Sequence, residues 1–366
     1  MSEEILRQLW KLRNDPFFPT LDAAGTALRP DALKRSLNPL LDARVLPFYF
    51  DIYDWNFSTL ARDISPTKGL VSFPDPRTQP SDSAFMFLLL GCRESGLDSL
   101  ANLILLKIKE VASGLEPLIV EVELAGREKA KNVATVAKLL LETLRNEGDE
   151  PPGLEKAVKK MQAAWDREYE RQQFNTNADY SDVFQSFRNQ LKDLIIRPLV
   201  LKIIAGGDND SWVRIHNAVK RTCSHVIVMT PDIAYAKTAY NSMSTQTQNV
   251  AWIRAVPLTR DKAQQFLQQR LSNERVSGAV LPPTRPLLPF LTEAIDVLYE
   301  PGSGEKRTEA LAHPVGWLRR MLYRALRDRL DSLVAAGVAA AALDLETTLI
   351  GAEQMKQAAQ LDAKRI

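Results

Sequence analysis

The chain has 366 residues, and its 47 basic residues nearly balance 45 acidic ones to give a formal net charge of +2. This length favours one large domain or two medium ones, and a hydrophobic content of 45% with 25% charged residues is typical of a globular protein. The charge balance excludes attraction of the whole chain to nucleic acid or membrane, and two cysteines with three scattered histidines exclude a disulfide framework or zinc knuckle.

The first 80 residues combine short helical pieces with Pro- and Asp-rich segments. The opening MSEEILRQLWKLRND is charged throughout and lacks an apolar signal core. Residues 13–20 (RNDPFFPT) are expected as a turn or extended segment, and residues 44–55 (RVLPFYFDIYDW) as an aromatic strand. No apolar run reaches the roughly 18 residues of a membrane span, so we expect a cytoplasmic protein.

From residue 85 onward, apolar strand segments alternate with helical segments. The expected strands are 85–90, 117–124, 198–207, 224–230 and 249–257. This alternation predicts an α/β fold, with a parallel sheet and helices on both faces. Such sheets bind ligands at the carboxyl ends of their strands.

After residue 258 the strands stop and only helical patterns follow. Thr259 is a plausible N-cap of the first of these helices, with Asp261 in its first turn. Further helices are expected over 287–301, 313–337 and the Ala-rich stretch 339–361. The end of the chain is therefore predicted to form a small helical domain.

The segment FMFLLLGCRESGLDSLANLILLKI, residues 85–108, has the layout of a nucleotide-binding P-loop: an apolar strand, a Gly-bounded turn and an amphipathic helix. Gly91 and Gly96 stand where the motif G-x-x-x-x-G-K-[ST] has its glycines. Leu97 replaces the Lys, and Asp98 replaces the Ser or Thr. Arg93, in the same loop, is a candidate for part of the missing positive charge.

This order of elements resembles the AAA+ and STAND group of P-loop ATPases, and especially bacterial AAA proteins. The opening LWKLRNDPFFPT is similar to the L-x-x-x-P-F segment before the core of such proteins. The resemblance covers roughly residues 5–330 and implies a P-loop NTPase (AAA+-like) parallel sheet core flanked by helices, with a C-terminal helical lid. The expected domains are an N-terminal linker or extension (1–80), the core (81–257, with insertion helices at about 154–194), the lid (258–335) and a C-terminal helix (336–366).

The resemblance also implies a site for ATP or ADP with Mg²⁺, although a chain with no cofactor is the other possibility. The residues expected to bind the nucleotide are Gly91, Arg93, Ser95, Gly96, Leu97, Asp98 and Ser99. Asp98 and Asp208 are the candidate metal ligands. Asp208, Thr230, Arg319 and Arg320 are the candidate catalytic residues, the last two as lid arginines that reach the γ-phosphate.

The second catalytic motif of the family departs from its pattern as well. In the strand PLVLKIIAGGDND, the two acidic positions fall near Ala205 and Gly206, and Asp208 comes too late. An ordinary polar turn before a helix is the alternative interpretation of Asp208. Thr230 before a proline is equally typical of a turn, and Arg319 and Arg320 are equally typical of solvated helix arginines.

With two motifs altered, we predict a catalytically degenerate AAA+-like regulatory or scaffolding subunit of a bacterial multi-protein complex, of the kind used in defence or mobile-element control. It would bind protein partners in a homo- or hetero-oligomer. One alternative is an active ATP hydrolase with divergent motifs. Another is a DNA-binding module that uses the basic segment 318–329.

Overall fold

The computed structural model describes residues 2–13, 15–17, 53–57, 84–91, 95–97, 100–101, 104–105, 108–109, 112, 114–124, 129–146, 153–172, 180–191, 194, 197–205, 211–231, 235–236, 238–241, 250–255, 258–299, 315–337 and 339–363. The chain divides into two compact units. The α/β unit comprises Tyr53–Arg93 and Leu97–Ala255, and the helical unit comprises Met1–Ile52, Glu94–Gly96 and Val256–Ile366.

Six strands form one sheet in the order β1-β6-β2-β5-β4-β3. They are β1 (Tyr53–Phe57), β2 (Phe85–Leu90), β3 (Leu118–Leu124), β4 (Leu199–Ala205), β5 (His225–Thr230) and β6 (Val250–Ala255). All neighbours from β2 to β6 pair in parallel, whereas β1 pairs antiparallel with β6. The predicted fold class, a parallel five-stranded core with flanking helices and a helical C-terminal region, is confirmed. Residues 44–52 of the expected aromatic strand lie outside the described residues.

The burial of each strand follows its place in the sheet. The central strands β2 and β5 are buried at every position, as expected for continuous apolar runs covered on both faces. The edge strand β3 alternates instead, with Glu121 and Glu123 exposed between buried Val120, Val122 and Leu124. One face of β3 therefore points to the core.

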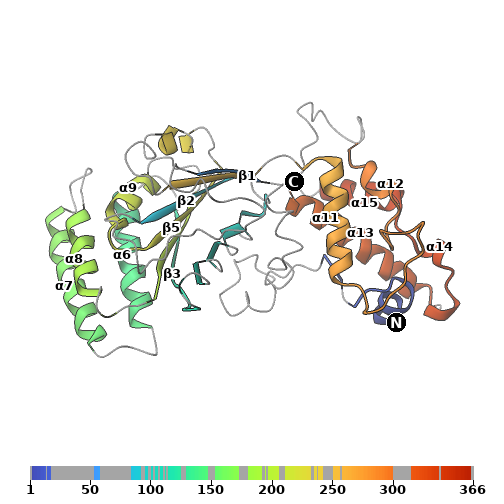
Figure 1. Ribbon diagram of the computed structural model, residues 1–366, viewed down its shortest axis with the longest axis horizontal. Coiled ribbons are helices and arrows are strands. Elements are labelled where there is room, and N and C mark those ends of the chain that lie inside the picture. Colours follow the sequence, from blue (N-terminus) through green and yellow to red (C-terminus); the bar gives the residue numbers. More distant parts are fainter. Residues whose placement is uncertain are drawn as a thin grey trace. The chain divides into compact units, whose positions relative to one another are not determined.

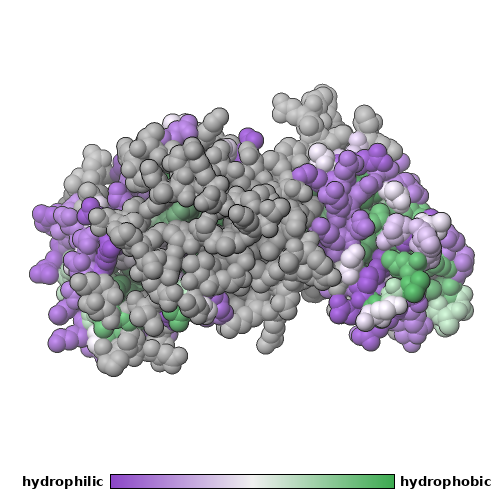
Figure 2. All heavy atoms as spheres, viewed as in Figure 1, coloured by the Kyte–Doolittle hydropathy of each residue, from purple (hydrophilic) through white to green (hydrophobic). Residues whose placement is uncertain are grey.

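Two layers of helices cover that face of the sheet (Figure 1). α6 (Lys129–Arg145) and α9 (Ser211–Val219) pack next to the strands, and α7 (Leu154–Gln172) and α8 (Ser181–Leu191) pack on these helices from outside. α7 buries one stripe at helical spacing, formed by Leu154, Ala157, Val158, Met161 and Trp165. The outer side of this pair is largely hydrophilic in Figure 2. α7 and α8 fall within the expected insertion at 154–194.

The helical unit contains α11 (Arg260–Asn273), α12 (Glu293–Asp296), α13 (Val315–Ala335), η3 (Ala340–Ala342), α14 (Leu345–Thr348) and α15 (Ala352–Ala363). The predicted cap of α11 is confirmed, because Thr259 Oγ1 accepts a hydrogen bond from the Lys262 N–H at 3.4 Å. None of the helices in the described parts of the chain is long and apolar enough to cross a membrane.

The predicted extents of two helices in this unit are wrong. The helix expected over 287–301 is reduced to α12, and the one expected over 339–361 is broken into η3, α14 and α15. A parallel bridge between Phe290 and Ile350 explains both breaks. Ile350 N–H donates to the Pro289 carbonyl at 2.9 Å, and Leu291 N–H donates to the Ile350 carbonyl at 2.9 Å, so both segments are extended where they meet.

The start of the chain, expected to be a linker or extension, folds locally within the helical unit. Residues 2–9 form α1 (Ser2–Glu4) and the π-helix η1 (Ile5–Leu9), and they belong to the helical unit with the end of the chain. Ile5, Trp10, Leu12 and Phe17 are almost completely buried.

Candidate functional site

The topology of the sheet creates a switch point at the carboxyl ends of β2 and β5. From β2 the chain runs to β3, at the far edge beyond β5 and β4, and from β5 it crosses β2 in the opposite direction to reach β6. Adjacent parallel strands whose connections leave in opposite directions form a switch point, which is the usual ligand position in an open α/β sheet. The sequence places the P-loop-like segment directly after β2.

Two of the predicted site residues meet at this point. Leu90 is in register with Thr230, and the next residue, Gly91, donates its N–H to the Thr230 carbonyl at 3.2 Å. Gly91 is buried, and Thr230 is only 2% exposed. The first residue of the loop is therefore fixed to the last residue of the neighbouring strand, although Thr230 has no demonstrated catalytic role.

Three more predicted residues lie where the loop enters its helix. Ser95 is buried, and Gly96 has φ +82°, in the left-handed region that favours glycine. Leu97 is the first residue in helical conformation, and its side chain is half-buried. The position of the motif lysine is thus the start of a helix, as in a P-loop, but it supplies no cation.

The remaining loop and acidic predictions are not tested. Arg93, Asp98 and Ser99 lie outside the described residues, as does Asp208. β4 ends at Ala205, one residue beyond the Ile204–Met229 pair, so Ala205 stands level with Thr230. No group of three or more potential metal ligands occurs in the part of the chain that the structure describes. The Mg²⁺ ligands Asp98 and Asp208 stay predictions.

The predicted lid arginines, Arg319 and Arg320, lie in the first half of α13 in the helical unit. Both are half-buried, and each takes part in an interaction with another group of the chain. Further along the same helix, Arg329 donates to the Thr347 and Thr348 carbonyls at the end of α14. At least part of the basic segment 318–329 therefore has an internal structural role.

Sequence reasoning missed a cation near the loop. Arg254, on β6, is in register with Leu90 from the other side of β2. Its guanidinium carbon lies 5.8 Å from the centroid of the Trp252 ring, a cation–π distance. The available signal was one charged residue near the end of the otherwise apolar segment VAWIRA.

Sequence reasoning also missed an ion pair between a buried lysine and an exposed glutamate on the second face of the sheet. Lys202, on β4, is 1% exposed, and its Nζ lies 3.1 Å from Glu121 Oε2 on the registered position of β3. A lysine in an apolar strand is the signal for such a pair, because a buried ammonium requires a partner.

Two buried side chains of the α/β unit, Cys223 and His225, are uncharged at neutral pH. Burial lowers the pKa of His225 to about 3 and raises the pKa of the Cys223 thiol to about 12. His225 begins β5, at the end of the strand opposite Thr230, and its ring stacks with Phe87 at 6.4 Å. These residues are core groups of the α/β unit.

No protein-family model matches the chain, and no curated protein matches it. Solved structures do show similarity. The ORC2 protein of Aeropyrum pernix, in ADPNP–ADP complexes, has 12% identity and a TM-score of 0.42, over 76% of this chain and 62% of that one. Cdc6p from Pyrobaculum aerophilum has 12% identity and a TM-score of 0.37, over 75% and 60%.

The ORC1 protein of Aeropyrum pernix, in complex with DNA, has 14% identity and a TM-score of 0.43, over 95% of this chain and 68% of that one. The matched part of the chain spans less than two thirds of the first two of these proteins. These neighbours are AAA+ proteins of the Cdc6/ORC group. At such low identity the similarity concerns the fold alone, and it transfers no activity, substrate or partner.

Proposed function

We propose that this chain is an AAA+-like regulatory or scaffolding subunit that binds nucleotide at the carboxyl ends of β2 and β5 and hydrolyses it poorly or not at all. The observation that carries the proposal is the loop after β2. Its first residue is fixed to Thr230 by a backbone hydrogen bond, and its last glycine, Gly96, has φ +82° immediately before a helix that begins with Leu97.

The residues of this loop are better suited to binding a phosphate group than to catalysing phosphoryl transfer. Phosphate binding at a loop–helix junction uses backbone N–H groups and the helix N-terminus, which the side chain at position 97 does not remove. Hydrolysis needs a lysine to neutralise the β- and γ-phosphates and acidic residues to hold Mg²⁺. Leu97 cannot neutralise charge. Asp98 and Asp208 are the residues that would hold the cation, and a bound ATP·Mg²⁺ would supply the phosphoryl group itself.

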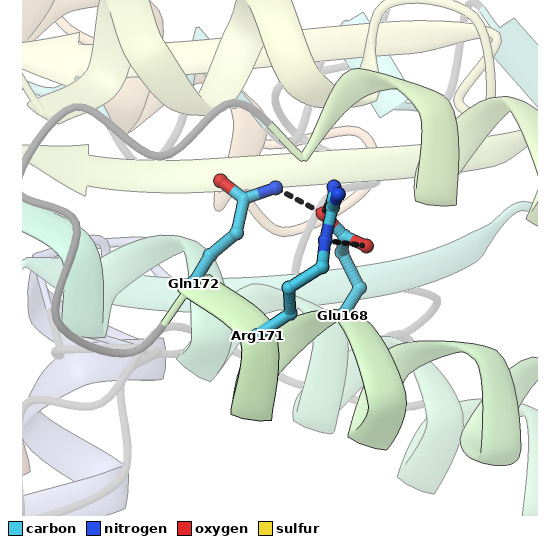
Figure 3. Close-up of polar contacts among 3 residues, drawn as sticks. All are labelled: Glu168, Arg171 and Gln172. Carbon is cyan, nitrogen blue, oxygen red and sulfur yellow. Dashed lines mark hydrogen bonds and ion pairs between the residues drawn. The ribbon is translucent and has the colours of Figure 1, made fainter.

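A partner surface on α7 and α8 belongs to the same proposal. Trp165 packs inward against Tyr180 at 4.9 Å between ring centroids, so the helix pair is anchored by aromatic side chains. The outward side is charged, and its charges are paired locally. At the end of α7, Arg171 Nε and Nη2 donate to the two oxygens of Glu168, which also accepts from Gln172 (Figure 3). This prearranged polar surface is suited to a protein partner in a bacterial multi-protein complex.

Titration of the full chain with ADP and with ATP·Mg²⁺ by isothermal calorimetry, together with a phosphate-release assay, tests the proposal. We expect measurable binding without turnover. Turnover that disappears in Asp208→Ala would instead establish an active ATPase with divergent motifs. The absence of binding to either nucleotide would refute the nucleotide part of the proposal.

DNA binding is tested separately by the fluorescence anisotropy of a labelled duplex. Contacts to phosphates would make the affinity fall steeply as salt increases. We expect no shift at low salt, since Arg329 of the basic helix is already used inside the protein. A strong salt-dependent shift would favour the DNA-binding alternative.

A further inference from the structure

The first residues of the chain are held by its last hundred residues. We infer that residues 2–17, called the strap below, complete the helical unit, so that α13, α14 and α15 hold their fold only while the strap is docked. This inference does not depend on nucleotide binding.

Backbone hydrogen bonds fix the register of the strap beside the segment that follows α11. Arg13 N–H donates to the Glu274 carbonyl at 2.7 Å, and Val276 N–H donates to the Lys11 carbonyl at 3.0 Å. Together they form an antiparallel bridge at Leu12. The strap is therefore joined to this segment by a single isolated bridge.

A half-buried cation, Arg275, joins the strap to a second segment of the unit. Arg275 donates from Nη1 to the Trp10 carbonyl at 2.7 Å and from Nη2 to the Leu288 carbonyl at 2.6 Å. Burial lowers the pKa of Arg275 to about 10, so the guanidinium is still charged at neutral pH. Hydrogen bonds from a charged donor are stronger than neutral ones, which favours a fixed position for the Trp10 backbone.

The side chains of the strap reach three further parts of the unit. The fully buried Trp10 donates from Nε1 to Thr348 Oγ1 at 3.3 Å, and this hydroxyl donates to the Leu345 carbonyl at 2.7 Å. The Phe17 and Phe290 rings meet edge to face at 5.7 Å. Arg327 Nε of α13 lies 3.1 Å from Asp15 Oδ2, whose side chain is only 5% exposed.

Loss of the strap would expose apolar surface and remove hydrogen-bond partners from polar groups. The Thr348 hydroxyl would lose the Trp10 N–H and keep only the Leu345 carbonyl, and Arg275 would lose the Trp10 carbonyl and keep only Leu288. The loss of one hydrogen bond at each group adds to the cost of exposing the apolar side chains of the strap. Trp10 and Thr348 are 338 positions apart, so nearly the whole chain must be synthesised before the unit can be completed. The residues before β1 and the residues after β6 therefore both belong to the helical unit. A lid that is joined to the core only after the last strand lacks the first of these connections.

Hydrogen exchange of the full chain, read by mass spectrometry of peptides, tests this inference. In Trp10→Ala, amides of α13, α14 and α15 should exchange faster by on the order of a hundredfold, whereas peptides of β2–β5 keep their wild-type rates. Gln8→Ala, which alters an exposed position of the same strap, should change neither set. A synthetic peptide of residues 1–17, added in excess to Trp10→Ala, should restore slow exchange.

Wild-type exchange of α13–α15 in Trp10→Ala would overturn the inference, as would equal acceleration in both units. If Trp10→Ala yields no folded protein, Trp10→Phe is a milder variant, because it keeps a six-membered aromatic ring and removes the pyrrole part of the indole with its N–H to Thr348. This variant should accelerate exchange by about tenfold in the same three helices. Acceleration elsewhere, or none, would count against the strap.

Discussion

Lowering the pH from 7 to 5 is expected to destabilise the α/β unit through two buried histidines. His216, on α9, is 3% exposed, and neither of its ring nitrogens has a hydrogen-bond partner among the described residues. Burial, with a smaller contribution from the charge of Lys220, lowers its pKa from 6.5 to about 4. His225, on β5, is fully buried, and burial alone lowers its pKa to about 3.

Both folded-state pKa values lie below the unfolded value, so the unfolded chain binds more protons between them. Stability is therefore greatest above pH 6.5 and falls as the pH drops towards the folded pKa. Between pH 7 and pH 5 each histidine should reduce the free energy of unfolding by about 2 kcal/mol, and by about 4 kcal/mol together.

Urea unfolding at both pH values, followed by hydrogen exchange of the α9 and β5 peptides, isolates the α/β unit from the helical one. His216→Leu and His225→Phe should each reduce the difference between pH 7 and pH 5 by about 2 kcal/mol, whatever their effect at pH 7. Carboxylates contribute equally to the wild type and the variants, and so cancel in this comparison. Identical pH dependence in a variant and the wild type would refute the reasoning.

Two further predictions concern the loop and the ion pair of the buried lysine. Gly96→Ala should weaken ADP binding by about tenfold, because a side chain strains the backbone at φ +82°. The control is Gly114→Ala, which introduces the same strain in a turn before β3 and should leave the affinity for ADP unchanged. Calorimetry that finds equal affinities for the two variants would contradict a phosphate-binding loop. Glu121→Gln should lower the free energy of unfolding by on the order of 1–2 kcal/mol. This loss should exceed that of Lys202→Met, because only Glu121→Gln leaves the ammonium of Lys202, a residue that is 1% exposed, without its charged partner. Denaturant unfolding gives the order of the two losses, and the reverse order would show that the pair is not held by burial of the lysine.

The sheet could be predicted from sequence because each core strand is an apolar run between turn signals. β5 begins one residue after the predicted start at 224 and ends at the predicted Thr230. The docking of the strap could not be predicted in this way. Trp10 and Leu12 have the pattern of a short amphipathic piece, and nothing local indicates a partner at Thr348. The prediction of one helix over the Ala-rich stretch 339–361 was wrong for a related reason, because the bridge at Ile350 overrides the local preference for helix.

The site illustrates the same division between local pattern and tertiary contact. Glycine spacing predicted the loop because Gly96 is needed for a backbone angle, which depends on its own residue type. The position of Thr230 beside Gly91 follows from strand order, which alternation alone does not give. Arg254 was missed because its nearness to Leu90 depends on β6 lying directly beside β2.

The proposed function, binding of nucleotide with little or no hydrolysis, follows from the different roles of backbone groups and side chains in such a loop. A phosphate-binding loop works mainly through N–H groups and a helix start, so it tolerates replacement of individual side chains as long as its glycines keep the required angles. Phosphoryl transfer depends on particular charged side chains, and their loss acts directly on the rate. Under the proposed function, Gly91 and Gly96 would keep the backbone role, and Leu97 would stand in place of the side chain that the reaction needs. Replacement of such a side chain lowers the rate of hydrolysis more than the affinity for nucleotide. A protein changed in this way binds nucleotide as a ligand and does not consume it as a substrate.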